Sequence, residues 1–169
     1  MKLIERDFYL DKLKNVMGTP DIKVITGVRR CGKSKLMDAF IDWIKQNEKD
    51  SNIIHINYNL FEYDSIKTAY ALDSYVEERY QSNKTNFLLI DEVQLCSDFE
   101  KVINSFHARE KYDIYITGSN AFLLSSDLAT LFTGRVFQIK VFPILYHVKI
   151  LPKKFCESSK KSYRKVDSQ

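Results

Sequence analysis

Cysteine is scarce in this sequence, and its pattern excludes two classes of small domain. The 169 residues include three cysteines, Cys31, Cys96 and Cys156, which are odd in number and far apart. They therefore indicate neither a disulfide framework nor a zinc-binding pair. The three histidines are equally isolated, so we expect structural or surface roles for them.

Long apolar segments are also lacking. No run approaches the roughly 18 consecutive apolar residues that read as a membrane-spanning helix. The first residues turn acidic at Glu5 and Asp7, where a signal peptide would need its apolar stretch. We therefore expect a cytoplasmic protein that does not enter a membrane.

Excess charge is absent from most of the chain and present at its end. Residues 149–169 contain seven of the 26 basic and two of the 22 acidic side chains, whereas residues 1–148 contain 19 basic and 20 acidic ones. We expect one domain over residues 1–145 and a basic, poorly ordered tail over residues 146–169. Binding of nucleic acid through residues 149–169 is an alternative that we do not favour, because short basic tails are usually solvated ends.

The most informative stretch runs from Gly27 to Ser34 and reads G-V-R-R-C-G-K-S, a phosphate-binding loop of the G-x-x-x-x-G-K-S type. In such a loop backbone N–H groups surround an anion and the following helix directs its positive end at the same point. Lys33 supplies charge for the β- and γ-phosphates, and Ser34 offers a hydroxyl to Mg²⁺. The candidate nucleotide contacts are Gly27, Val28, Arg29, Arg30, Cys31, Gly32, Lys33, Ser34 and Lys35.

Three side chains within this loop have open roles. Arg29 and Arg30 either contact phosphate or point outward to a partner, and the residues alone do not decide between these roles. Cys31 is either a redox-sensitive thiol or a small residue that fills space.

The segments around the loop alternate between strand-like and helix-like patterns. We expect strands at 22–26, 53–57, 87–90, 113–117 and 136–142, and helices at 5–17, 33–47, 64–81, 99–110 and 121–129. This alternation predicts an α/β fold with a parallel sheet covered on both faces. Ligands of such sheets bind beyond the carboxyl ends of the strands.

Polar residues follow the strands that we expect to share this edge. Asp91 would hold Mg²⁺ directly or through water. Glu92 would orient and deprotonate the water that attacks the γ-phosphate. Ser119 or Asn120 could sense the γ-phosphate, and Arg135 could stabilise charge on the transferring phosphoryl group, from its own chain or from a neighbour's.

Four motifs together resemble a prokaryotic family of AAA-type P-loop ATPases. They are Gly27–Ser34, Leu89–Gln94, Thr117–Asn120 and Thr133–Arg135. They occur in the family's order, and the likeness covers roughly residues 2–145. The resemblance implies an ATPase core with a five-stranded parallel sheet in the order 5-1-4-3-2, sandwiched by helices.

The resemblance also implies residue roles. Glu92 would activate water, Ser119 or Asn120 would be the sensor, and Arg135 would be a candidate arginine finger, whereas the motif leaves the role of Gln94 open. Members of the family usually carry a further C-terminal domain. This chain departs from their pattern after Pro143, so we expect a truncated member without that companion domain, which would otherwise be a partner.

The sequence therefore predicts an ATP-binding protein, specifically a Mg²⁺-dependent ATP hydrolase whose nucleotide cycle drives a conformational change. Two alternatives remain: a nucleotide-holding switch or remnant that does not turn over, and a nucleic-acid-associated ATPase. The guanine-reading pattern Asn-Lys-x-Asp is absent, since residues 83–86 end in Asn. The choice of ATP over GTP nevertheless rests mainly on the resemblance, and the sequence gives no oligomeric state.

Overall fold

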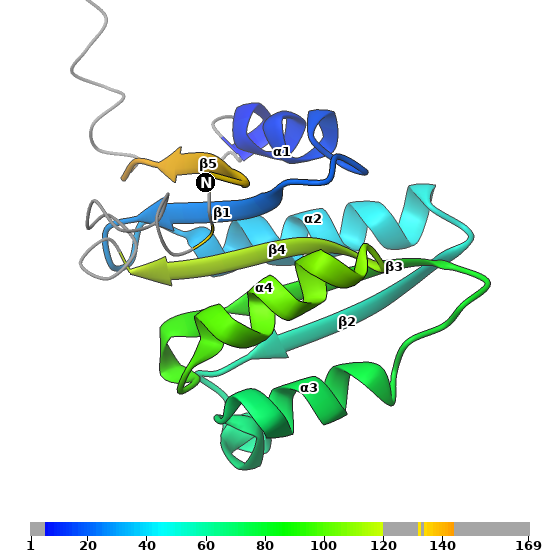
Figure 1. Cartoon of the computed structure of the whole chain (residues 1–169). Helices are drawn as coiled ribbons and strands as arrows, with labels where there is room; N and C mark the ends of the chain where they lie inside the picture. Colours follow the sequence, from blue (N-terminus) through cyan, green and yellow to red (C-terminus); the bar gives the residue numbers. More distant parts are fainter. Residues whose placement is uncertain (1–5, 120–131, 133, 144–169) are drawn as a thin grey trace, which may run out of the picture.

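A five-stranded parallel sheet forms the centre of the computed structural model, which describes residues 6–119, 132 and 134–143 (Figure 1). The strands are β1 (Ile22–Gly27), β2 (Ser51–Asn57), β3 (Thr85–Asp91), β4 (Tyr112–Ser119) and β5 (Val136–Val141). They lie in the order β2-β3-β4-β1-β5, and every neighbouring pair is parallel. This is the expected order 5-1-4-3-2 read from the other side, so the predicted fold is confirmed.

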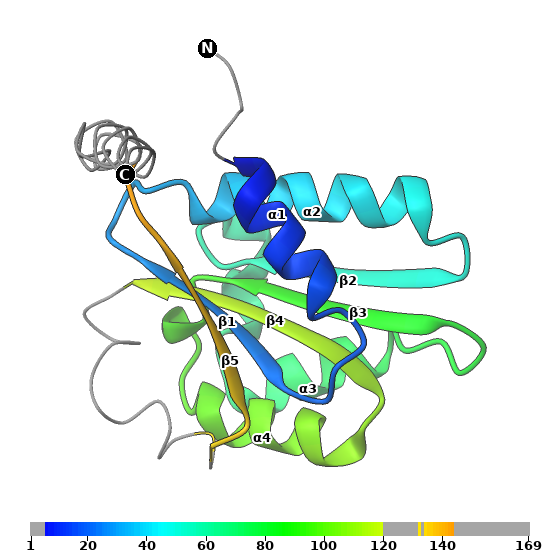
Figure 2. The ribbon, with the colours of Figure 1, turned by 90° about the horizontal axis from the view of Figure 1, so that it is seen from above.

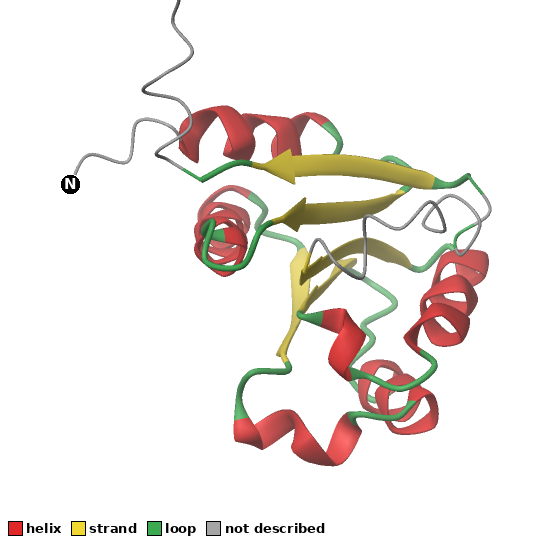
Figure 3. Ribbon diagram, turned by 90° about the vertical axis from the view of Figure 1, so that its left-hand side faces the viewer, coloured by secondary structure: helices red, strands yellow, loops and turns green. Residues whose placement is uncertain are grey.

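Helices cover both faces of the sheet. Figure 2 shows α1 (Arg6–Asn15) and α2 (Lys33–Asn47) on one face, with α3 (Ala69–Glu77) and α4 (Phe99–Arg109) on the other. The view in Figure 3 shows the same two layers of helix around the strands. Two short 3₁₀ helices, η1 (Phe61–Ile66) and η2 (Val93–Leu95), follow β2 and β3.

The burial of these elements follows their sequence patterns. Every residue of β1 is buried, and so is every residue of β3 after Thr85, as expected for central strands covered on both faces. On α2 the apolar residues at helical spacing are all buried; they are Leu36, Met37, Phe40, Ile41 and Ile44. None of the helices in the described ranges is both long and apolar enough to cross a bilayer.

One expected helix, at 64–81, is wrong in its extent. The chain instead forms η1, which ends at Ile66, and α3, which begins at Ala69. Thr68 separates them because its extended backbone and its side-chain oxygen, which accepts a hydrogen bond from the backbone N–H of Ala71 at 3.3 Å, cap a new helix. The helix expected at 121–129 and the tail expected at 146–169 lie outside the described residues.

A buried ion pair lies at the amino edge of the sheet, where the parallel strands begin. Lys23 Nζ is 2.6 Å from Asp113 Oδ1, and the two side chains are 0% and 6% exposed. Lys23 also donates to the carbonyl oxygen of Thr19. Asp113 Oδ2 accepts hydrogen bonds from the backbone N–H of Gly18 at 2.9 Å and from the hydroxyl of Tyr115 at 3.1 Å. The pair therefore fastens the α1–β1 connection to the start of β4.

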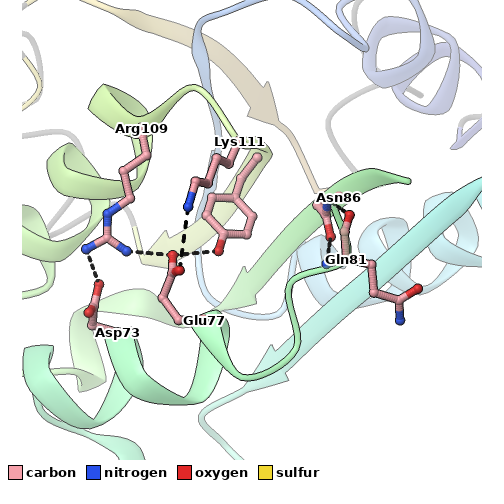
Figure 4. A network of polar contacts seen from close by, with 7 residues as sticks. Asp73, Glu77, Gln81, Asn86, Arg109 and Lys111 are labelled. Carbon is pink, nitrogen blue, oxygen red and sulfur yellow. Dashed lines mark hydrogen bonds and ion pairs between the residues drawn. The ribbon is translucent and has the colours of Figure 1, made fainter. Parts of the chain in front are cut away.

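A second polar network at the amino edge joins α3 to α4 (Figure 4). The guanidinium of Arg109 contacts Asp73 Oδ1 at 2.8 Å and Glu77 Oε1 at 2.6 Å. The Tyr112 hydroxyl donates to Glu77 Oε1 at 2.8 Å, and Lys111 Nζ lies 3.8 Å from Glu77 Oε2. Burial favours the neutral form of Glu77, but the hydrogen bonds from Tyr112 and Arg109 outweigh it and lower the pKa of Glu77 from its ordinary value.

Candidate functional site

The loop after β1 turns tightly into α2, and its two glycines make this turn feasible. A Cβ added to Gly27 would lie 2.5 Å from Cys31 Sγ and 2.6 Å from the carbonyl oxygen of Val141. Gly32 has φ +97°, a left-handed conformation that favours glycine. Cys31 is buried against Gly27, a placement that favours the space-filling role over the redox role.

Lys33 begins α2 and directs its ammonium between two segments of the chain. Its side chain is 5% exposed. Nζ donates to the carbonyl oxygen of Gly27 at 3.2 Å and lies 3.9 Å from Glu92 Oε1. The structure therefore brings the phosphate-binding loop and the Asp91-Glu92 pair together at the carboxyl edge of the sheet. An ammonium has three donor hydrogens, so it retains capacity for an anion.

One hydroxyl holds the Asp91 carboxylate, at the end of β3, and the backbone of the next residue, Glu92. Thr117 Oγ1, on the neighbouring strand β4, donates to Asp91 Oδ1 and accepts from the backbone N–H of Glu92 at 3.0 Å. Glu92 is held at φ +56°, in the left-handed region. The Thr117–Asn120 motif contained Thr117 without giving it a role. The sequence feature that marks Thr117 is a hydroxyl directly after three buried residues of β4, beside the carboxylate at the end of β3.

Gln94 adds a contact to the side chain of Glu92. It lies on η2, directly after the carboxylates, and its Nε2 donates to Glu92 Oε2. Glu92 is thus contacted on one carboxylate oxygen by Gln94 and approached on the other by Lys33. The motif had left Gln94 without a role, because a side-chain contact two residues back along the chain requires the 3₁₀ turn that sequence patterns did not predict.

The oxygen atoms at this edge fit a magnesium–polyphosphate ligand. Asp91 is 1% exposed, and its Oδ2 is buried without a hydrogen-bond partner among the described residues. Ser34 follows Lys33 at the start of α2 and is half-buried. In the described ranges no group of three or more His, Cys, Asp or Glu side chains could hold a metal ion. Mg²⁺ takes one or two protein ligands and completes its shell with water and phosphate oxygens, so Ser34 and Asp91 would suffice as its protein ligands.

The other predicted site residues on and near the loop do not all lie close to its centre. Ser119 is the last residue of β4, and its backbone pairs in register with Gly27, so it lies beside the phosphate-binding loop as expected. Asn120 lies outside the described residues. The outer residues of the loop and its flank have exposed side chains; they are Val28, Arg29, Arg30 and Lys35.

Arg135 lies at the wrong edge for the role expected of it within its own chain. Its carbonyl oxygen accepts a hydrogen bond from the backbone N–H of Ile22 at 2.9 Å, and the next residue, Val136, pairs with Ile22. Arg135 therefore adjoins the start of β1, whereas the phosphate-binding loop follows its end. At about 3.3 Å per residue, the strand separates their backbones by about 17 Å, so the structure does not bring the backbone of Arg135 to the phosphate-binding loop of its own chain. Contact with a neighbour's phosphoryl group stays a prediction.

Comparison with known proteins gives one family and two long relatives. Residues 19–148 match the family model described as AAA domain. An uncharacterized protein of Haemophilus influenzae is 40% identical over 146 residues, which are 85% of this chain and 36% of that protein. One from Methanocaldococcus jannaschii is 28% identical over 172 residues, covering 98% of this chain and 35% of that protein. The chain spans about a third of the length of these relatives.

Solved structures share the fold at low sequence identity. Domain III of the replication initiation protein DnaA from Thermotoga maritima has a TM-score of 0.53 and 23% identity, and the match covers 80% of this chain and 62% of that one. PCH-2 from C. elegans has a TM-score of 0.56 and 14% identity, with 82% and 43% covered. These likenesses concern the fold alone. The family match, which covers most of the chain, shows that the chain belongs to the AAA domain family of nucleotide-binding P-loop ATPases.

Proposed function

We propose that this protein binds Mg²⁺–ATP at the carboxyl edge of its sheet and hydrolyses the γ-phosphate, and that this cycle drives a conformational change. The observation that carries the proposal is the approach of Lys33 Nζ to Glu92 Oε1 at 3.9 Å. It joins the residue that would hold the β- and γ-phosphates to the residue that would activate water. A single triphosphate can span both.

The residues divide the work of binding. Backbone N–H groups of the loop surround the phosphates, and Lys33 adds a positive charge. Ser34 and Asp91 would hold Mg²⁺, which when bound neutralises charge on the β- and γ-phosphate oxygens. Thr117 keeps Asp91 and the backbone of Glu92 in place through its hydroxyl.

Glu92 would act as the general base. The attacking water gives a proton to the Glu92 carboxylate, its oxygen forms a bond to the γ-phosphorus, and the bond to the bridging oxygen breaks with its electron pair left on ADP. Before nucleotide binds, Lys33 lies beside one oxygen of this carboxylate. Phosphate groups compete for the same ammonium, so their arrival would free that oxygen for water.

Phosphate release with and without Mg²⁺ tests the proposal. We expect Lys33→Ala to lose Mg²⁺-dependent phosphate release, and Glu92→Gln to bind ATP while its hydrolysis rate falls by about 10²–10⁴-fold, the usual contribution of a general base. Glu78→Gln, at an exposed position directly after α3, is the matched control and should behave as the parent. Hydrolysis by Glu92→Gln at the parent's rate would rule out this base. Tight ATP binding by the parent without release would support the nucleotide-holding switch instead.

The nucleotide base needs a separate titration. Nothing in the loop selects adenine over guanine, because its groups grip phosphates. Membership of the ATPase family is the support for ATP. We expect GTP to bind more weakly than ATP in parallel titrations with Mg²⁺, and equal affinities would remove the preference.

A further inference from the structure

We propose that Gln94 is a positioning residue that holds the carboxylate of Glu92 for its reaction with water. The inference rests on the ATP hydrolysis proposed above and adds to it the residue that orients the base. The central observation is the hydrogen bond from Gln94 Nε2 to Glu92 Oε2. It leaves Oε1 as the oxygen that faces Lys33.

The backbone of Glu92 is already fixed, but its side chain is not. The N–H of Glu92 donates to Thr117 Oγ1 at 3.0 Å, and η2 continues from its carbonyl oxygen, which accepts from the N–H of Leu95 at 3.0 Å. A glutamate side chain has several rotatable bonds beyond this point. The Gln94 amide restricts them by occupying one of the two carboxylate oxygens.

Gln94 is itself carried by a short, anchored turn. Val93 beside it is fully buried, and the N–H of Cys96 donates to the carbonyl oxygen of Val93 at 3.0 Å. This 3₁₀ turn brings the side chain of Gln94 back toward the residue two positions before it. The amide therefore reaches Glu92 from a rigid part of the chain, as a positioning group requires.

The other end of the Gln94 amide shows that Glu92 alone orients it. In the part of the chain that the structure describes, two buried side-chain N or O atoms lack a partner, Gln94 Oε1 and Asp91 Oδ2. Buried amides in proteins are normally paired at both ends. Because Oε1 has no such partner among the described residues, the hydrogen bond to Glu92 is the polar contact that orients the Gln94 amide there.

Asn86, at the opposite edge of the sheet, shows what a structural amide looks like here. Its Oδ1 accepts from Asn52 Nδ2 at 2.7 Å and from the backbone N–H of Gln81 at 3.0 Å. Its Nδ2 donates to the carbonyl oxygens of Gln81 at 2.8 Å and Lys84 at 2.9 Å. Every one of these partners belongs to the amino end of the sheet, and none is a carboxylate.

The consequence concerns the moment at which phosphates engage Lys33. The ammonium then leaves Glu92 Oε1, and without Gln94 both carboxylate oxygens would lose their partners and the side chain would turn freely. With Gln94, Oε2 stays held and Oε1 stays directed at the space that Lys33 and the phosphates share. Gln94 thus affects the rate of hydrolysis and leaves nucleotide affinity nearly unchanged.

Gln94→Met tests this role because it keeps the length of the side chain and removes the donor. We expect the single-turnover hydrolysis rate to fall about 10- to 100-fold, the size expected when a reacting group is misplaced, with ATP affinity close to the parent's. Gln94→Glu, which sets a second carboxylate against Glu92, should be slower still. Gln81→Met replaces an exposed glutamine and should leave the rate unchanged. Hydrolysis by Gln94→Met at the parent's rate would overturn the inference.

A double variant separates positioning from a general loss of structure. If Gln94 acts through Glu92, adding Gln94→Met to Glu92→Gln slows hydrolysis no further than Glu92→Gln alone. A further loss in the double variant would overturn the inference, because it would show that Gln94 acts independently of the carboxylate.

A measurement without turnover distinguishes failure of this inference from failure of the proposed function. In ¹⁵N NMR spectra we expect the side-chain amide protons of Gln94, assigned by their loss in Gln94→Met, to shift in Glu92→Gln while those of Gln81 do not. An unchanged Gln94 signal would overturn the contact whatever the hydrolysis rate. If the Gln94 signal shifts in Glu92→Gln but the parent hydrolyses no ATP, the contact exists and the hydrolase function is overturned, and the positioning role with it.

Discussion

The two edges of the sheet differ in whether their buried polar groups have hydrogen-bond partners among the described residues. At the amino edge, Lys23 and Asp113 form a buried ion pair that also bonds to Thr19, Gly18 and Tyr115. At the carboxyl edge, the described residues leave Asp91 Oδ2 and Gln94 Oε1 buried without partners, and Glu92 adopts a left-handed backbone conformation.

This difference indicates that the polar groups of one edge stabilise the fold and those of the other serve the site. A buried polar group without a partner destabilises a protein, so it persists where a ligand completes it or where the arrangement serves a reaction. The amino edge, with its polar groups paired, is built to hold the elements together. The carboxyl edge retains capacity for a metal ion and an anion. Substitutions at the two edges should therefore change different measurements.

The largest expected effect is on stability, at the amino edge. Asp113→Ala leaves the ammonium of Lys23 buried and without its counter-ion, and breaking a buried pair in this way typically costs about 3–5 kcal/mol. Urea unfolding measures the loss. Lys23→Met combined with Asp113→Leu removes both charges and should recover much of it. A loss below about 1 kcal/mol in Asp113→Ala would mean that the pair does not hold the edge together.

Removal of Lys33 should give the opposite result at the carboxyl edge. In Lys33→Met we expect ATP affinity to fall by about 1.5–3 kcal/mol, roughly 10- to 150-fold, the contribution of hydrogen bonds to charged groups. The free energy of unfolding should stay near the parent's, because the ammonium has one hydrogen bond, to the Gly27 carbonyl oxygen, and a carboxylate at 3.9 Å. Titration calorimetry measures the ATP affinity, and urea unfolding measures the free energy of unfolding. If Lys33→Met unfolds more easily than the parent but binds ATP equally well, Lys33 serves stability and the contrast between the two edges is wrong.

Thr117 contributes both to stability and to the site, so its substitution should change both the free energy of unfolding and the hydrolysis rate. Thr117→Val removes the donor to Asp91 and the acceptor for the N–H of Glu92, and an unsatisfied buried group costs about 1–3 kcal/mol. The hydrolysis rate should fall as well, because the Asp91 carboxylate and the backbone of Glu92 both lose a partner. Thr117→Ser keeps the hydroxyl and should restore the rate. If the Val and Ser variants hydrolyse ATP equally fast, the hydroxyl does not position Asp91 and Glu92.

The smallest expected effect concerns the acid stability of the α3–α4 network. The pKa of Glu77 is lower in the folded protein than its ordinary value of 4.5, so Glu77 contributes stability above that value and loses it as the pH falls through the folded-state pKa. Because the network is partly exposed, we expect Glu77→Gln to cost about 0.2–1 kcal/mol near pH 7. The difference from the parent should shrink below pH 4.5. Glu78→Gln, at the next residue, is more exposed and serves as the control.

The sequence was sufficient for the sheet and for the edge at which the site lies. The glycine pattern around Lys33 and the apolar run before Asp91 each identify the end of a strand, and parallel strands bring such ends together. Arg135 lies apart from these strand ends because it precedes its strand and is therefore at the amino edge. The side-chain contacts of Thr117 and Gln94 depend on strand register and on a 3₁₀ turn, which neither periodicity nor composition specifies.

The effect of Mg²⁺ on ATP affinity tests the central claim most directly. The parent should bind ATP much more tightly in Mg²⁺ than in EDTA, because a metal ion held by Ser34 and Asp91 links the phosphates to the end of β3. Asp91→Asn should lose most of this gain while retaining the weaker binding in EDTA that Lys33 and the loop provide. A gain from Mg²⁺ of the same size in Asp91→Asn as in the parent would contradict the account.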